Sequence, residues 1–382
     1  MDILFSMDNI NKKKRIVYLD IAKGIGMILV LLGHLQNDTI FSYSPYILSL
    51  CSWIFSFHMA LFFIISGMLM AVKGENESDI RIFIRKRFKS IMIPYFWFSL
   101  IYLFIVLYSL LIDKVVPLKT LFIQLWYVLG MYGMNVLWFL PALFAGEVLF
   151  VFLTQRFKNH KSIFIIMILL AVAISINQLR SSLPNNYELS ERLNELIITL
   201  TRPVFVCSYI FIGYYIYKGF RLVSSKVSNI LAIMIPAVPV FLVINIYVNT
   251  LNRPVDFRSL VLNNYPMYYL SSVCGSVAIL FISRILSELH IGSRINGETG
   301  FPLLKFYGLN SLTFMAVHNN SAIMRLSLLA AMYINQFLTR ARGYICYCII
   351  ILIFLVYVTL TILIINRFFP FITGRPKKKQ NN

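Results

Sequence analysis

The segment Tyr18–His34, which reads YLDIAKGIGMILVLLGH, indicates what kind of protein this chain is. It is apolar and long enough to cross a lipid bilayer, which takes about 20 mainly apolar residues in a helix. Yet it contains three ionisable side chains, those of Asp20, Lys23 and His34. An ionisable group at the centre of a span costs about 3 kcal/mol to insert and is a candidate functional residue. The segment therefore predicts a membrane helix that faces something other than lipid.

The rest of the chain has the composition of a polytopic membrane protein. Of its 382 residues, 59% are hydrophobic and 13% are charged, whereas average usage is about 25% charged. About ten segments are apolar enough to span a bilayer. They lie near 16–35, 47–71, 91–111, 136–154, 162–178, 203–217, 229–248, 266–287, 302–322 and 345–366. A further stretch, 118–135, predicts a re-entrant or interfacial helix. The predicted fold class is an all-α, polytopic integral membrane protein.

The net charge of +20 does not indicate a nucleic-acid-binding protein, because the basic residues are clustered between apolar segments. The clusters are 12–15, 81–89, 218–226 and 375–379. Lys and Arg in short loops mark the cytoplasmic side of a membrane protein and attract anionic lipids. We therefore expect membrane lipids as partners and both termini in the cytoplasm. The predicted organisation is a basic N-terminus at 1–15, a membrane-embedded domain at 16–367 and a basic tail at 368–382.

The ionisable residues of the first span share one stripe of the helix. Lys23 and His34 are eleven positions apart, which is three turns and about 16 Å along the axis. Under the predicted topology Lys23 lies toward the cytoplasm and His34 toward the outer side. The alternative is that Lys23 reaches the inner headgroups, Asp20 pairs with it and His34 caps the outer end.

The second predicted span contains FHMALFFIISG, residues 57–67, and places His58 in an otherwise uncharged run. Such a histidine lines a cavity, takes part in chemistry or forms a hydrogen bond to a neighbouring helix. Because two consecutive spans each bring a histidine, a shared polar cavity is the favoured interpretation.

Several motifs in this order resemble the membrane-bound acyltransferase-3 family, especially its branch of fucose 4-O-acetylase-like proteins, which are bacterial surface-polysaccharide O-acetyltransferases. They are Tyr18–His34 above, FHMALFFIISGMLM (57–70), IPYFW (93–97), LWFLPALFAGEVLF (137–150) and GLNSLTFMAVH (308–318). The resemblance covers essentially the whole chain. It is most specific at Lys23 and His34, which match the family's pattern of a basic residue, ten residues and a histidine. The chain departs from the family three residues before Pro94, where Ile91 replaces an arginine.

The resemblance implies transfer of an acyl group, usually acetyl from cytoplasmic acetyl-CoA, to a sugar hydroxyl at the outer face of a bacterial inner membrane. The implied acceptor is a cell-surface glycan, such as O-antigen, capsule or exopolysaccharide, or its lipid-linked precursor. His34 is the expected general base, because imidazole accepts a proton near neutral pH, with His58 as a second base or polar support. Lys23 would stabilise the oxyanion or hold the donor, and Asp20 would orient Lys23. Direct transfer and an acyl-histidine intermediate both stay open.

The basic segment after the second span is expected to bind the phosphates of the acyl donor through Arg85, Arg87 and Lys89, together with Lys23. Four residues are candidates for binding the acceptor: Trp138 at the start of the fourth span, and Asn310, Ser311 and His318 in the ninth. Interfacial anchoring of the tryptophan and hydrogen bonds between helices are the alternatives for these four. No metal site is predicted, since no H-E-x-x-H motif is present.

Three further charged residues, Arg253, Asp256 and Arg258, lie on a predicted outer loop. They could meet an anionic glycan, although solvated loop charges are commoner. Glu147 lies in the middle of a span, and the sequence names no partner for it.

Two other classes of function compete with an enzyme. A transporter or flippase for a glycan or small metabolite would also place ionisable groups in its spans, and a structural subunit would need a partner. The basic loop directly after the His58 span and the lack of an internal repeat favour the enzyme. The sequence leaves open the acceptor sugar, acetyl against succinyl as the acyl group, and the oligomeric state, a homodimer included.

Overall fold

The computed structural model of the chain is built of helices. It describes residues 16–34, 45–75, 79–113, 116–157, 159–181, 188–227, 229–288, 301–319, 329, 333 and 342–374. Within these residues there is no β-strand, and the extended pairing is limited to one isolated bridge between Asp256 and Val261. The predicted all-α fold is therefore confirmed.

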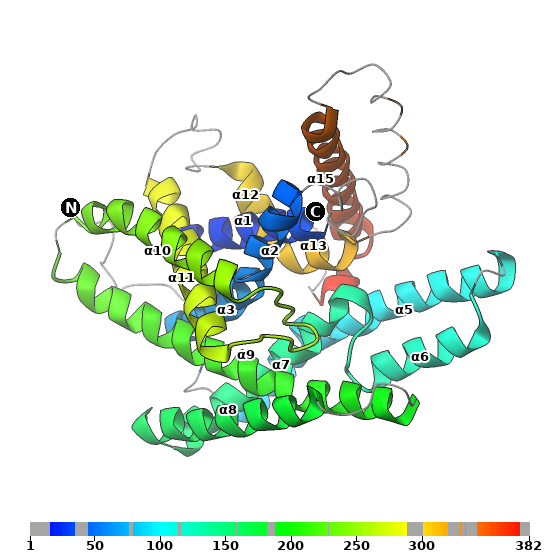
Figure 1. The fold of residues 1–382 in the computed structure, drawn as a ribbon, viewed down its shortest axis with the longest axis horizontal. Helices are drawn as coiled ribbons and strands as arrows, with labels where there is room; N and C mark the ends of the chain where they lie inside the picture. Colours follow the sequence, from blue (N-terminus) through cyan, green and yellow to red (C-terminus); the bar gives the residue numbers. More distant parts are fainter. Residues whose placement is uncertain are drawn as a thin grey trace, which may run out of the picture.

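The helices follow one another along the chain without a separate soluble unit among the described residues (Figure 1). They are α1 (Val17–His34), α2 (Pro45–Phe55), α3 (His58–Lys73), α4 (Ile80–Arg87), η4 (Phe88–Met92), α5 (Ile93–Tyr108), η5 (Ser109–Asp113), α6 (Leu118–Leu129), η6 (Asn135–Trp138), α7 (Phe139–Arg156), α8 (Asn159–Ser181), α9 (Glu188–Ser224), α10 (Leu231–Leu251), α11 (Tyr265–Glu288), α12 (Pro302–Leu309), α13 (Ser311–Val317), α15 (Arg342–Phe368) and η7 (Pro370–Thr373).

Nine helical runs among the described residues are long and apolar enough to cross a membrane. They are Val17–His34, Tyr46–Lys73, Ile80–Ile112, Asn135–Arg156, His160–Ser181, Leu189–Ser224, Leu231–Leu251, Tyr265–Glu288 and Cys348–Phe368. Each corresponds to one of the spans expected from the sequence, and the protein is a multi-pass membrane protein. Helix α6 is a shorter apolar helix, and its re-entrant or interfacial placement stays a prediction.

The segment 302–322 was predicted to form one continuous span, and its described part does not. Its described part forms two short helices, α12 and α13, which are separated at Asn310 by a non-helical backbone with φ −111° and ψ 20°. Helix α12 packs so closely on α1 that a Cβ at Gly308 would lie 1.8 Å from the Asp20 carbonyl oxygen. This contact fixes the direction of α12. At the C-terminal end of α12, the side-chain amide of Asn310 donates a hydrogen bond to the Phe306 carbonyl of the last helical turn.

The basic cluster at 81–89, expected in a loop, is helical. Asp79 caps the helix that carries it by accepting hydrogen bonds from the backbone N–H groups of Arg81 and Ile82. The π-helical turn η4 then connects α4 to α5 without a break. The basic side chains therefore have fixed positions on a helix. The terminal clusters at 12–15 and 375–379 lie outside the described residues.

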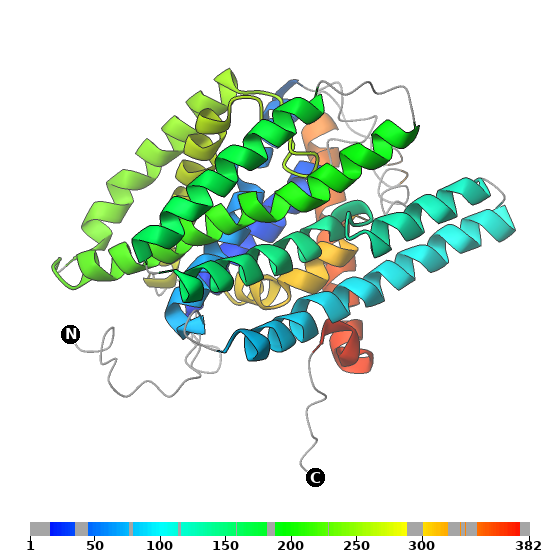
Figure 2. The same ribbon diagram turned by 90° about the horizontal axis from the view of Figure 1, so that it is seen from below.

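Helices α1 and α3 form the centre of the bundle, whereas α5 lies at its edge. In the span Tyr46–Lys73, 78% of the most apolar window is buried inside the protein, against 17% in Ile80–Ile112. Helices α5 and α6 lie side by side and extend away from the rest (Figures 1 and 2). The ionisable residues of α1 and α3 therefore face other helices.

Close backbone contact holds the central helices together. A Cβ at Gly67 on α3 would lie 2.1 Å from the Ile210 carbonyl oxygen of α9, and a Cβ at Gly213 would lie 2.0 Å from the Ile64 carbonyl oxygen of α3. The two glycines thus let α3 and α9 cross with their backbones in contact.

One end of the bundle, which we call the Lys23 end, carries Lys23 and the basic residues of α4 and η4. Tyr18, at the start of α1, lies under the Arg284 guanidinium of α11 at 5.4 Å. Gly374 lies against the backbone of Lys89, so the last described residue is also at this end. His34 lies at the opposite end of α1, which we call the His34 end.

Candidate active site

A single cavity of about 580 Å³ contains most of the residues selected from the sequence. Its walls are formed by helices α1, α2, α3, α4, α7 and α13, the turns η4 and η6, and the loop segment 255–258. Lys23 and His34 both line it, so it extends along α1 for three turns, about 16 Å. The shared stripe on the first span is therefore a cavity wall.

At the Lys23 end, the cations that line the cavity are already paired. The Lys23 ammonium lies 2.6 Å from a carboxylate oxygen of Asp20. Arg87 binds Glu147 in a bidentate manner, with Nε donating to Oε2 at 2.5 Å. Ser66 donates to the same carboxylate at 2.5 Å. Glu147 is fully buried, so Arg87 compensates its charge inside the protein, and Ser66 adds a hydrogen bond.

The other predicted donor-binding residues lie outside the cavity. Arg85 and Lys89 are exposed at the same end of the bundle and do not line it. Lys86 pairs with Glu75 at 2.5 Å. Burial opposes ionisation of Glu75, but Arg87 and Lys86 outweigh it and hold the pKa of this carboxyl below its ordinary value. The basic residues thus form an exposed rim beside the cavity.

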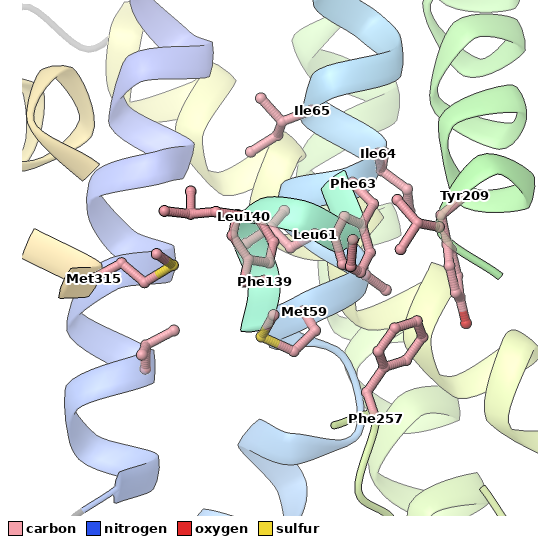
Figure 3. Close-up of a cluster of buried hydrophobic side chains, with 14 of the residues drawn as sticks. Met59, Leu61, Phe63, Ile64, Ile65, Phe139, Leu140, Tyr209, Phe257 and Met315 are labelled. Atoms are coloured by element: carbon pink, nitrogen blue, oxygen red, sulfur yellow. The ribbon is translucent and has the colours of Figure 1, made fainter. Parts of the chain in front are cut away.

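Apolar side chains line the middle of the cavity. They are Met27, Val30, Phe62, Ile65, Leu69, Leu140, Leu143 and Met315. Figure 3 shows part of this lining, with Ile65 and Leu140 between α1 and the aromatic cluster around Phe63. Phe63 stacks on Phe139 with ring centroids 5.1 Å apart. This packing fixes α3 against α7 and keeps the middle of the cavity free of charge.

Three histidines gather at the His34 end. The rings of His34 and His318 have their centroids 5.1 Å apart, and Phe55 contacts both His34 and His58. His58 Nδ1 lies 2.9 Å from the Ile54 carbonyl oxygen, and His318 Nδ1 lies 2.7 Å from that of Met315. The cluster contains every histidine that lines the cavity.

These backbone contacts fix the tautomers of two of the rings. A carbonyl oxygen can only accept, so in neutral His58 and His318 the proton lies on Nδ1 and the lone pair on Nε2. His318 Nε2 is buried and has no hydrogen-bond partner among the described residues. An acceptor nitrogen is therefore available beside the His34 ring.

One of the two roles expected for Lys23 does not fit this arrangement. A thioester carbonyl within reach of His34 would be about 16 Å along the axis from the level of Lys23, which is far more than a lysine side chain extends. Stabilisation of an oxyanion by Lys23 therefore conflicts with His34 as the base, and contact with the donor remains its compatible role.

The expected acceptor-binding residues divide into two groups. Trp138, Ser311 and His318 line the cavity. Asn310 does not line it, and its amide bonds to the Phe306 carbonyl and to Asn366 instead. The Trp138 ring lies under the Arg202 guanidinium at 4.8 Å, so it is held in place from behind.

Asp256 and Arg258 were expected from the sequence as possible contacts for an anionic glycan, and both line the cavity, although their loop position gave no sign that the loop folds over His34. Asn135, which the sequence did not single out, also lines the cavity, and its side-chain oxygen accepts a hydrogen bond from the Asn319 side-chain amide at 2.8 Å. No local pattern could have revealed these contacts. Among the described residues, no group of His, Cys, Asp or Glu could hold a metal ion.

The fold and the cavity define a membrane-embedded protein with three histidines at one end of a buried cavity and two paired cations, Lys23 and Arg87, at the other. The acyltransferase domain of the acyltransferase-3 family matches residues 16–363, and the chain belongs to this family. It is therefore an acyltransferase, of a kind that transfers acyl groups to carbohydrate hydroxyls. No curated protein and no solved structure matches the chain.

Proposed function

We propose that the protein is an O-acetyltransferase of a bacterial cytoplasmic membrane. It transfers acetyl from cytoplasmic acetyl-CoA to a hydroxyl of a cell-surface carbohydrate, or of its lipid-linked precursor. The observation that carries this proposal is the single cavity in which His34 and Lys23 occupy opposite ends. Such a cavity can receive a donor at one end and an acceptor at the other.

The donor enters at the Lys23 end. The exposed Arg85 and Lys89 beside this end attract the phosphates of coenzyme A from solution. The pantetheine arm is long, thin and without formal charge, which suits the apolar middle of the cavity. Lys23 and Arg87 offer donors to the arm or to a phosphate where it enters. The acetyl thioester then reaches the His34 end.

The histidine cluster performs the transfer. His34 accepts the proton of the acceptor hydroxyl as the hydroxyl oxygen attacks the thioester carbonyl carbon. The carbon–sulfur bond breaks, and the departing thiolate takes the proton from the His34 imidazolium. His318 Nε2, unpartnered among the described residues, accepts a hydrogen bond from the other His34 nitrogen. This bond orients the ring and stabilises the imidazolium, as in other base–orienter pairs.

The test is acetyl transfer by purified protein supplied with radiolabelled acetyl-CoA and candidate glycans. We expect His34→Ala to remove transfer while the variant still reaches the membrane fraction. His160→Ala is the matched control, because His160 is an exposed histidine on α8 outside the cavity. Unchanged transfer by the His34 variant would exclude its role as base. Uptake of a glycan into liposomes without acetyl-CoA, in place of acetyl transfer, would instead support a transporter.

A further inference from the structure

We propose that the acceptor is an anionic sugar, and that Arg258 binds its carboxylate or phosphate at the His34 end of the cavity. The proposal rests on the proposed acetyl transfer, whose acceptor it specifies. It depends on three observations: the Arg258 guanidinium has no ion-pair partner among the described residues, its loop is held by hydrogen bonds, and its surroundings carry a net positive charge.

Arg258 carries the one positive charge of the cavity lining that lacks a partner among the described residues. Three lysine or arginine side chains line the cavity, those of Lys23, Arg87 and Arg258. Lys23 pairs with Asp20, and Arg87 pairs with Glu147. The Arg258 guanidinium has no hydrogen bond or ion pair to any described residue. A half-buried guanidinium with five free donors is a ready binding group for an anion.

The neighbouring carboxylate of Asp256 does not neutralise this guanidinium. Its oxygens accept from the backbone N–H groups of Arg258 and Ser259, at 2.9 Å and 3.3 Å, and from the Ser259 hydroxyl at 2.5 Å. Asp256 therefore closes the turn and leaves the Arg258 side chain available.

The loop that presents Arg258 is held by donors from two helices. The carbonyls of residues 258–260 each accept a hydrogen bond from a different side chain: Arg202 at 2.5 Å, Arg180 at 3.0 Å and Asn177 at 2.8 Å. Consecutive carbonyls held in this way keep an irregular loop in one conformation. A binding group on a fixed loop loses little entropy when its ligand arrives. Arg258 is thus preorganised at the cavity.

The surroundings of Arg258 favour negative charge. Arg202 is buried, lies behind Trp138 and makes hydrogen bonds to carbonyl oxygens alone among the described residues. Together with Arg258 it outweighs the single charge of Asp256. The acceptor side of the cavity is therefore net positive before the substrate binds, and a low-dielectric cavity strengthens its attraction for an anion.

The anionic group that Arg258 binds can come from two parts of the acceptor. A carboxylate would belong to a uronic-acid type of sugar within the glycan, and a phosphate would be the group that links a sugar to its lipid carrier. Both match the planar fork of a guanidinium. A bound anion would also lie near His34 when that ring becomes an imidazolium, so its charge would assist the proton transfer.

The test compares sugars that differ only in charge. The probes are methyl glucoside, methyl glucuronoside and glucose 1-phosphate, with the corresponding galactose set, and binding to the purified protein without donor is followed by saturation-transfer NMR. We expect at least one charged sugar to bind about tenfold or more tightly than its neutral counterpart. The uronoside and the 1-phosphate separate the two sources.

Variants of Arg258 decide whether this preference belongs to the proposed site. Arg258→Gln should abolish the preference, and Arg258→Lys should retain part of it, because lysine keeps the charge but not the fork. Arg253→Gln, in the same loop but exposed and outside the cavity, should leave the preference unchanged. Unaltered thermal unfolding of the variants shows that the loop still folds.

Two outcomes overturn the proposal: no charged sugar binds better than its neutral counterpart, or Arg258→Gln retains the preference. The proposed transfer fails separately. If the charged sugar binds through Arg258 but no acceptor receives label from acetyl-CoA, the anion site stands and the acetyltransferase proposal falls.

Discussion

Replacing Glu147 by glutamine tests whether the buried charge pair of the cavity holds the bundle together. Glu147 is fully buried and accepts from Ser66 and twice from Arg87, whose side chain is 17% exposed. Glu147→Gln keeps the shape but leaves the Arg87 guanidinium inside the membrane domain without its counter-charge. We expect the substitution to destabilise the protein strongly.

The magnitude follows from the burial of the pair. Removing one partner of a buried ion pair costs about 3–5 kcal/mol. An unfolding entropy of about 2.1 cal/mol/K per residue, over 382 residues, corresponds to about 0.8 kcal/mol per degree. The melting temperature should therefore fall by at least about 4 °C. The fall should be larger if membrane helices keep their helicity on unfolding, because the unfolding entropy is then smaller.

Thermal unfolding of purified protein in nanodiscs measures this loss. The double variant Arg87→Gln/Glu147→Gln should recover much of the stability, because no buried charge remains and two amides can bond to each other. Lys86→Gln is the matched control, since Lys86 is 58% exposed and its pair with Glu75 is worth about 1 kcal/mol or less. Equal melting temperatures of Glu147→Gln and Lys86→Gln would refute the reasoning, as would strictly additive effects in the double variant.

Three further predictions address packing, catalysis and donor binding. Gly67→Val should prevent the folded protein from accumulating, because its Cβ would lie 2.1 Å from a backbone oxygen of α9, whereas Gly219→Val, with nothing within 4 Å, should elute normally in size-exclusion chromatography. His318→Leu should lower kcat about tenfold or more at unchanged KM for acetyl-CoA. His318→Gln should lower kcat less, because its amide oxygen can still accept a hydrogen bond from His34. Equal losses of kcat in the two variants would exclude the positioning role of His318. The paired substitution of Arg85 and Lys89 by Gln should raise KM for acetyl-CoA severalfold at low salt and little at high salt, with kcat unchanged.

The membrane spans were predictable because hydrophobicity is a local property of the chain. Nine segments were found within a few residues of their helices, apart from longer ends such as that of Ile80–Ile112. The segment 302–322 was not predictable in form. Its break at Asn310 accompanies the contact of Gly308 with the backbone of α1, which is a tertiary contact that hydropathy does not record.

The site was predictable where a residue had no other reason to be in a membrane. Lys23, His34 and His58 were selected on the cost of burying them, and all three line the cavity. Arg87 and Glu147 show the limit of this reasoning. From the sequence, Arg87 was interpreted as a phosphate binder and Glu147 was left without a role. In the structure the two form an ion pair, although they are 60 positions apart in the sequence.

The distribution of charge in the cavity distinguishes its two ends more sharply than the sequence could. At the Lys23 end, the lining cations are neutralised by Asp20 and Glu147, and the unpaired ones stand outside on an exposed rim. Phosphates drawn to that rim need not enter the cavity, where they would have to compete with existing carboxylates and lose their hydration. At the His34 end the arrangement is reversed, because the free guanidinium of Arg258 is inside. This distribution of charge supports the proposal that an uncharged arm enters from the Lys23 end and that a charged ligand is held at the His34 end.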